Sequence, residues 1–197
     1  YMACVHACWK TTLAIRCVTM RLTQLNEEKQ KLALERLQAD RSDYEPFLSK
    51  ESIDIHYGKL AKGYVDRFNA GEGDTDFNQA GAFLHNIYFP QLKEPAGSNN
   101  PRGASLMLIN SKHGSYDKFK SEVTKVAMGI QGSGWVYMAR NGEIKTIKNH
   151  AMRSDIAMLI DWWEHSWFTD YGSDKSKYLT NFWKAVDWEV VNQRILT

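Results

Sequence analysis

The sequence has little of the sulfur chemistry that holds many small domains together. Only three of its 197 residues are cysteines, and all of them, Cys4, Cys8 and Cys17, lie in the first seventeen positions. Their spacing fits neither a paired zinc-binding motif nor an even set of disulfides. We therefore expect the rest of the chain to fold without cysteine ligands or cross-links, as is usual in a reducing compartment.

The sequence also lacks an excess of charge of one sign. Its 25 Lys and Arg residues nearly balance 23 Asp and Glu residues, and the two kinds are interspersed. This pattern predicts no nucleic acid and no membrane surface as a partner. No apolar run is long and uncharged enough to cross a bilayer, and the sequence holds no phosphate-binding loop or dinucleotide fingerprint.

Residues 1–22 have no acidic residue but contain Lys10, Arg16 and Arg21. Two interpretations remain open for this segment. It could be an organelle transit segment, or it could be sequence upstream of a natural start at Met20. We expect a cytoplasmic protein, or a mitochondrial matrix protein if residues 1–22 are a transit segment.

The first part of the fold is predicted to be helical. Residues 26–39 carry spaced leucines among charged residues and predict a peripheral helix, so that residues 1–43 form an N-terminal extension. Ser49 is a candidate N-cap for a helix that runs to Asn69. The glycine- and acid-rich connector 70–76 ends it, and a second helix is expected over 77–92. Residues 44–95 therefore predict an antiparallel helical hairpin domain.

A cluster of Pro, Gly and Asn residues between positions 95 and 103 marks a boundary. Beyond it the sequence predicts a helix over 116–129, strands over 134–139, 144–147 and 156–160, and helices between 175 and 196. Asn141-Gly142 is a typical hairpin turn. The fold class is therefore α+β: the helical hairpin domain is followed by a C-terminal α/β domain, 101–197, with a three-stranded antiparallel sheet and helices.

Asp161 and His165 stand four residues apart in a run of aromatic residues that follows the third predicted strand. His56 and His85 lie on the two predicted core helices. Each alone could be an ordinary core residue or part of an ion pair, but together they offer three imidazoles and one carboxylate. That set suits zinc, iron or manganese. A hydrolytic triad is poorly supported, because Gly132-Ser133-Gly134 is not a nucleophile elbow.

Several sequence blocks resemble the iron/manganese superoxide dismutase family over about residues 44–195. The most specific blocks are Gly132-Ser133-Gly134-Trp135 and Asp161-Trp162-Trp163-Glu164-His165. The others are Ile55-His56-Tyr57-Gly58-Lys59 with Tyr64-Val65, Phe83-Leu84-His85 with Tyr88-Phe89, Gly114-Ser115 with Phe119-Lys120, and Tyr178-Leu179 through Phe182-Trp183 to Asp187-Trp188.

The resemblance implies that His56, His85, Asp161 and His165 bind one iron or manganese ion per chain. It also implies the family reaction, in which superoxide is converted to dioxygen and hydrogen peroxide as the metal cycles between two oxidation states. Zinc has no such redox cycle, whereas iron and manganese do.

The resemblance also assigns residues around the ligands. Tyr64 matches the family's gateway tyrosine, and Trp135 and Trp163 belong to the matching blocks. Gly81 stands where iron-type members often have a glutamine, and His150 matches the glutamine of manganese-type members. A histidine at this position would titrate near neutrality. The alternative interpretation is that His150 is a surface residue on a loop.

A homodimer is implied by Glu164, which in the family reaches the partner's ligand histidine. Leu60 and Phe168 stand where the family commonly has a histidine and a tyrosine that meet at the interface. Both hydrogen-bonding partners have been replaced, which is less costly than losing one of them. An altered gateway is therefore expected.

Two alternatives to the dismutase remain. One is a non-catalytic scaffold or interaction protein with this fold, and the other is a metal-dependent hydrolase or oxygenase on the same site. The intact ligand set argues against the first, and the aromatic enclosure, which suits only a very small substrate, argues against the second.

Overall fold

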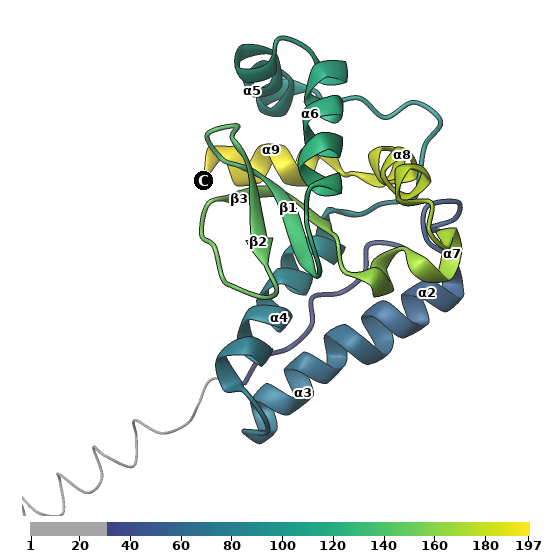
Figure 1. Ribbon diagram of the computed structural model, residues 1–197, viewed down its shortest axis with the longest axis vertical. Helices are drawn as coiled ribbons and strands as arrows, with labels where there is room; N and C mark the ends of the chain where they lie inside the picture. The colour runs from purple at the N-terminus through teal and green to yellow at the C-terminus, as the bar shows by residue number, and fades with distance from the viewer. Residues whose placement is uncertain (1–30) are drawn as a thin grey trace, which may run out of the picture. The chain divides into compact units, whose positions relative to one another are not determined.

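A computed structural model describes residues 31–197, of which Leu32–Thr197 form one compact unit (Figure 1). The observed order of elements is helical first, then a three-stranded antiparallel sheet with helices, as the sequence predicts. The domain boundaries expected at 44–95 and 101–197 remain predictions. None of the described helices is long and apolar enough to cross a membrane.

The peripheral helix predicted over 26–39 is wrong for the described residues 31–39, which have no helical hydrogen bonding. Backbone N–H groups of this segment are bound instead by side chains of the helices. Leu32 N donates to Asn69 Oδ1 at 2.8 Å, and Glu35 N donates to Asn86 Oδ1 at 2.9 Å. Tertiary hydrogen bonds therefore outweigh the helix propensity of the segment.

The first core helix begins where Ser49 caps it, with the Ser49 side chain accepting from Ser52 N at 3.1 Å. It runs as α2 (Lys50–Ile55), a π-helical segment η1 (His56–Ala61) and α3 (Lys62–Ala70). Gly71, at φ 70°, ends it in the left-handed region that favours glycine. The π-helical segment begins at His56 and is not evident from the sequence.

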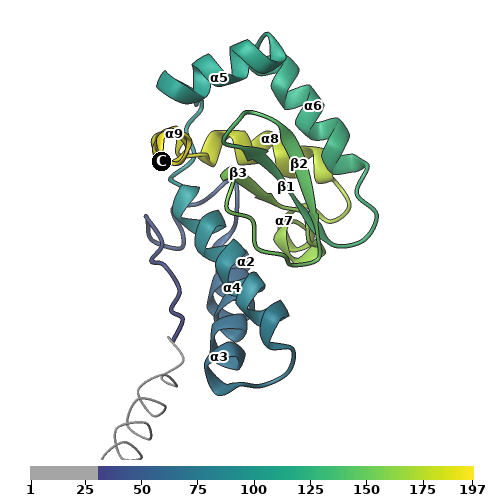
Figure 2. The same ribbon diagram turned by 90° about the vertical axis from the view of Figure 1, so that its left-hand side faces the viewer.

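The second core helix, α4 (Thr75–Tyr88), is capped by Asp74 and continues as a short 3₁₀ segment, η2 (Phe89–Gln91). The helix was predicted to start at Phe77 but starts two residues earlier, because the Asp74 side chain caps it by accepting a hydrogen bond from Phe77 N. Helices α3 and α4 contact each other along their length and lie side by side in Figure 2. This is the predicted helical hairpin.

The sheet has the strand order β2-β1-β3, with both pairs antiparallel. Its strands are β1 (Gly134–Ala139), β2 (Ile144–Lys148) and β3 (Ile156–Asp161). Gly142 forms the predicted hairpin turn at φ 86°. Strands β1 and β3 are buried at every position, and Asp161 ends β3 opposite Trp135.

The remaining helices surround the sheet. They are α5 (Gly103–His113), α6 (Tyr116–Met128), α7 (Phe168–Tyr171), α8 (Lys175–Ala185) and α9 (Trp188–Leu196), with a 3₁₀ turn η3 (Glu164–Ser166) after β3. Helix α5 was not predicted. Its apolar residues do not share one face, and Met107 is 71% exposed, so the sequence carries no amphipathic period there.

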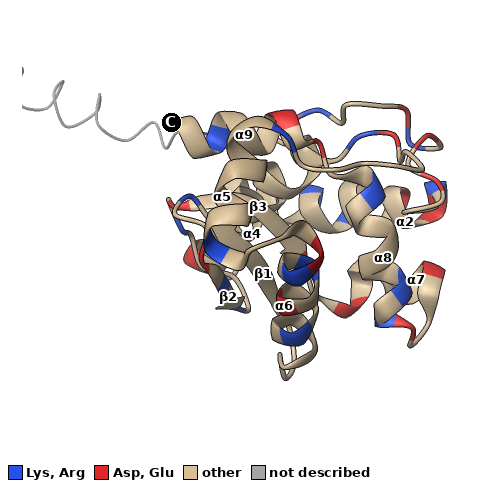
Figure 3. Cartoon of the chain, turned by 90° about the horizontal axis from the view of Figure 1, so that it is seen from above, with Lys and Arg blue, Asp and Glu red and all other residues tan. Residues whose placement is uncertain are grey.

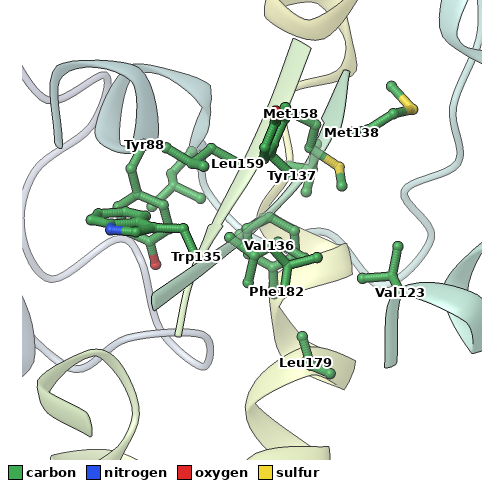
Figure 4. Close-up of a cluster of buried hydrophobic side chains, with 14 of the residues drawn as sticks. Tyr88, Val123, Trp135, Val136, Tyr137, Met138, Met158, Leu159, Leu179 and Phe182 are labelled. Carbon is green, nitrogen blue, oxygen red and sulfur yellow. The ribbon is translucent and has the colours of Figure 1, made fainter. Parts of the chain in front are cut away.

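The core lies on both faces of the sheet. Trp135 points toward Tyr88, whereas the next residue, Val136, points the other way toward Leu179 and Phe182 (Figure 4). This alternation follows from the period of two in a strand. Acidic and basic residues are interspersed along the ribbon of the outer elements in the view of Figure 3.

Candidate metal centre

Four side chains from four separate elements meet in the interior. His56 begins η1, His85 lies in the last turn of α4, Asp161 ends β3, and His165 lies in η3. One potential ligand atom from each lies within 4.8 Å of all the others. Asp161 Oδ2 is 3.1 Å from His56 Nε2, 3.4 Å from His165 Nε2 and 3.7 Å from His85 Nε2.

Hydrogen bonds outside the group orient two of the ligands. His85 Nδ1 lies 2.7 Å from the carbonyl oxygen of Gly81, so the ring donates there and leaves the lone pair of Nε2 free. Asp161 Oδ1 accepts from Trp163 N at 2.8 Å, and the Asp161 carbonyl accepts from Tyr178 Oη at 3.0 Å. The carboxylate therefore keeps Oδ2 for the centre of the group.

The fit of a metal ion can be judged from the buried atoms. His56 Nε2, His85 Nε2, His165 Nε2 and Asp161 Oδ2 are buried and have no hydrogen-bond partner among the described residues. Leaving a buried polar group unpartnered costs about 1–3 kcal/mol, so four such atoms in one place require an explanation. An ion bound by all four removes the cost, and three imidazoles with one carboxylate fit iron or manganese.

The protonation states also suit a cation. Burial lowers the pKa of His56, and it lowers the pKa of His85 to about 3, so both rings are neutral at pH 7. Burial by itself would raise the pKa of Asp161, but the neighbouring His165 and His56 rings outweigh it and lower that pKa. The group therefore offers an anionic oxygen and, from His56 and His85, neutral nitrogens.

Tyr64 and Gly81 lie against each other beside the ligands. A Cβ atom at position 81 would lie 2.8 Å from Tyr64 Cγ, so only glycine leaves room for the phenol ring where it stands. The Tyr64 ring is 5.4 Å from the His85 ring and is covered by the Arg67 guanidinium at 5.1 Å. Burial raises the pKa of the Tyr64 phenol.

His150 is buried, not a surface loop residue, with 9% of its surface exposed. Its ring stacks on Trp163 with centroids 4.5 Å apart, and it contacts Tyr64 and Phe77 at 4.8 and 4.7 Å. Burial lowers its pKa to about 4, so the titration near neutrality expected from the residue type does not occur.

Of the residues predicted for a dimer interface, Glu164 and Phe168 lie at the surface close to His165 in the sequence. Glu164 is exposed, Phe168 is 55% exposed, and Leu60 is partly buried. Sequence reasoning did not identify Phe77, which packs on His150, or the Gly81 carbonyl and Tyr178 hydroxyl that orient the ligands. A backbone carbonyl has no sequence signal, and Phe77 was noted only as the start of a helix.

Known proteins are similar to this chain over most of its length. Residues 101–194 match the family model described as iron/manganese superoxide dismutases, C-terminal domain. The chain is 32% identical to the Mn/Fe superoxide dismutase of Porphyromonas gingivalis over 176 residues, which cover 76% of this chain and 91% of that protein. The chain belongs to the iron/manganese superoxide dismutase family.

Other relatives carry iron alone in their names. The Fe superoxide dismutase of Bordetella pertussis is 34% identical over 73% of this chain and 88% of its own length, and that of Pyrobaculum aerophilum is 29% identical over 77% and 85%. In this iron/manganese superoxide dismutase family member, the matched C-terminal region supplies Asp161 and His165, and the helices before it supply His56 and His85.

Proposed function

We propose that this protein is a superoxide dismutase that uses one iron or manganese ion per chain. The observation that carries the proposal is the group of four buried ligand atoms without hydrogen-bond partners, His56 Nε2, His85 Nε2, His165 Nε2 and Asp161 Oδ2. Names of relatives that cover most of both chains support the same activity. The scaffold alternative is not favoured, because a non-catalytic chain has no need of this ligand set.

The bound ion supplies one-electron exchange, by which two superoxide ions and two protons become one dioxygen and one hydrogen peroxide. The protein's own groups do the rest. Asp161 contributes the negative charge that would stabilise the oxidised ion, and the three imidazoles would complete the ligand set. Tyr64 and His150 flank the group, with ring centroids 5.4 and 6.0 Å from that of His85, and each carries a polar atom that could hydrogen-bond a small anionic substrate.

Aromatic rings limit what can enter. Tyr64, Phe77 and Trp163 surround His150 at ring distances below 5 Å, while His165 keeps 19% of its side chain exposed. We infer that an enclosure of this kind suits a diatomic anion better than a larger substrate. This argues against a hydrolase at the same site.

We also propose a homodimer that serves as an antioxidant enzyme. Glu164 is exposed beside the ligand His165 and has no ion-pair partner within the described part of its own chain, and the apolar ring of Phe168 is exposed close by. In a two-fold dimer both residues would meet the partner subunit at the rim of the metal site.

A cytoplasmic location is proposed, because all three cysteines precede residue 18 and residues 18–197 therefore contain no disulfide. The mitochondrial matrix is the alternative if residues 1–22 are a transit segment. Fractionation of cells that express the tagged protein distinguishes the two compartments.

Elemental analysis of the purified protein, combined with a superoxide-consumption assay, tests the activity. We expect about one iron or manganese ion per chain and superoxide consumption that disappears when the metal is removed and returns when it is restored. A protein that binds neither ion, or that consumes no superoxide when loaded with either, would refute the proposal.

A further inference from the structure

Strand β2 forms one edge of the sheet and pairs with β1 on one side only (Figure 1). In an antiparallel pair, positions that hydrogen-bond the partner strand alternate with positions whose N–H and C=O groups point away from it. Asn149, just beyond β2, donates its N–H to the carbonyl of Ser133 at 3.0 Å. Counting back from Asn149, the backbone groups of Lys148, Thr146 and Ile144 point away from β1. None of these three N–H groups donates to another group in residues 31–197.

A hollow of about 550 Å³ lies between β2 and the end of α6. Val126 and Ile130 give it apolar walls, and Thr146 and Lys148 line it from the strand. Side chains two residues apart in a strand share one face of the sheet. A further strand paired with the outer edge of β2 therefore places every second side chain on the side of this hollow.

The charges around the hollow favour an acidic occupant. Lys125 and Lys148 line it, are exposed, and take part in no ion pair within residues 31–197. Glu122 is the acidic residue that lines it, and its Oε2 is engaged by His113 Nδ1 at 2.6 Å. A second copy of β2 is a poor occupant, because pairing two such edges brings the lysines of both copies together.

We propose that the outer edge of β2 and the adjoining hollow dock an extended acidic segment of another protein, which joins the sheet as a further strand. Backbone hydrogen bonds to Thr146 and Lys148 hold the segment. Its acidic side chains meet Lys125 and Lys148, and apolar side chains on the same face fill the hollow against Val126 and Ile130. This interaction goes beyond the proposed dismutase activity and needs neither the metal site nor catalysis.

The probe is a fluorescein-labelled octapeptide with blocked ends, Thr-Glu-Thr-Val-Thr-Glu-Thr-Val, titrated with the purified full chain. As a strand it presents glutamate and valine on one face and threonine on the other. We expect a saturable rise in fluorescence anisotropy with a Kd between about 1 μM and 1 mM. The same peptide with lysine in place of glutamate should not bind. An acidic peptide that does not bind, or that binds no better than the basic one, would overturn the proposal.

Hydrogen exchange followed by mass spectrometry identifies the mode of binding. The outward N–H groups of Thr146 and Lys148 should exchange fast in the unbound protein and become protected when the acidic peptide is bound. Protection that appears only on other elements would place the peptide at another surface. Protection of these two groups before the peptide is added would show that the edge is already covered. Either result would rule out the proposed docking site.

Thr146→Pro removes one outward N–H group but no β1–β2 hydrogen bond, and proline is tolerated at such edge positions. We expect the Kd for the acidic peptide to rise at least about tenfold, since a hydrogen bond is lost and the proline ring obstructs the added strand. Thr146→Val is the matched control, because it keeps the N–H group and should bind like the wild type. Wild-type affinity in Thr146→Pro would contradict the proposal.

Lys148→Glu tests the charge of the hollow without changing the backbone. We expect it to weaken binding of the acidic peptide several-fold. Lys177→Glu makes the same change of charge on α8, outside the residues that line the hollow, and should leave the affinity unchanged. Equal affinities of these two variants would count against the proposal. If Thr146→Pro does not fold, Lys148→Glu and the exchange measurement on the wild type decide.

Discussion

His56 Nε2 lies 3.1 Å from Asp161 Oδ2, although His56 belongs to the first core helix and Asp161 ends the last strand. The contact lacks the geometry of a hydrogen bond, and both atoms are buried without partners. An ion between them would join the helical hairpin to the sheet. Metal binding and the stability of the fold should therefore be coupled.

His165→Ala removes one ligand from the partly exposed side of the group. We expect metal affinity to fall by more than about 100-fold, beyond the range typical of outer-shell changes, and activity to be lost with it. Elemental analysis and a superoxide assay measure both. The matched control is His113→Ala, since His113 hydrogen-bonds Glu122 and the Gly142 carbonyl outside the ligand group. A His165→Ala protein with full metal content and activity would argue against the site.

Asp161→Asn should have distinct, separately measurable effects on the stability of the metal-free protein and on metal binding. The substitution removes a buried charge but keeps the oxygen that accepts from Trp163 N. We expect the metal-free variant to be less stable than the metal-free wild type, because the lowered pKa of Asp161 means that the folded chain stabilises its anionic form. The stabilisation on metal addition, about 4 kcal/mol at a thousandfold excess over Kd, should disappear. Urea unfolding with and without a chelator measures both, and a variant that metal still stabilises would contradict the expectation.

The metal-free protein should lose stability as pH falls from about 6.5 toward 4. The folded-state pKa values of His150 and His85 are lowered to about 4 and 3 from the ordinary 6.5. In that window the unfolded chain binds protons that the folded chain does not, so protonation favours unfolding. Each such histidine contributes up to about 1.4 kcal/mol per pH unit.

Urea unfolding of the metal-free protein at several pH values between 7 and 4.5 measures this dependence. His150→Gln is the matched variant, and its unfolding free energy should fall less steeply with pH because one of the two histidines is gone. Equal slopes for the wild type and His150→Gln would mean that His150 titrates as in the unfolded chain.

Phe168→Asp should convert the expected dimer into a monomer. Phe168 is 55% exposed beside the metal site, so the substitution removes no contact from the core. A charge buried at an interface without a partner costs several kcal/mol, enough to raise the dimer dissociation constant at least about 100-fold. Light scattering after size-exclusion chromatography measures the mass. Met107→Asp on α5 changes a residue that is 71% exposed and should remain dimeric; a Phe168→Asp dimer would place the interface elsewhere.

Much of the fold was predictable from local patterns. The cap at Ser49, the turn at Gly142 and a third strand over 156–160 follow from residue types and spacing, and all are observed, with the strand one residue longer at Asp161. The helix expected over 26–39 failed in its described part because side chains from distant helices take its backbone hydrogen bonds. Helix α5 was missed because its apolar residues are not arranged on one face.

Part of the candidate site was also predictable from the sequence, and part was not. Residue types at fixed spacing, and their resemblance to a family, were enough to single out three imidazoles and a carboxylate as one ligand set. The environment of His150 was not available from the sequence, because its low pKa and its hydrogen bond depend on Trp135 and on rings from three other parts of the chain.

The sequence by itself determined which atoms could bind a metal and which local elements carry them, since both depend on residue chemistry and short-range geometry. Only the tertiary structure decided that these atoms lie within 4.8 Å of one another, buried and without other partners. Burial and hydrogen-bond direction arise from packing between distant segments, and packing of that kind is a property of the folded chain alone.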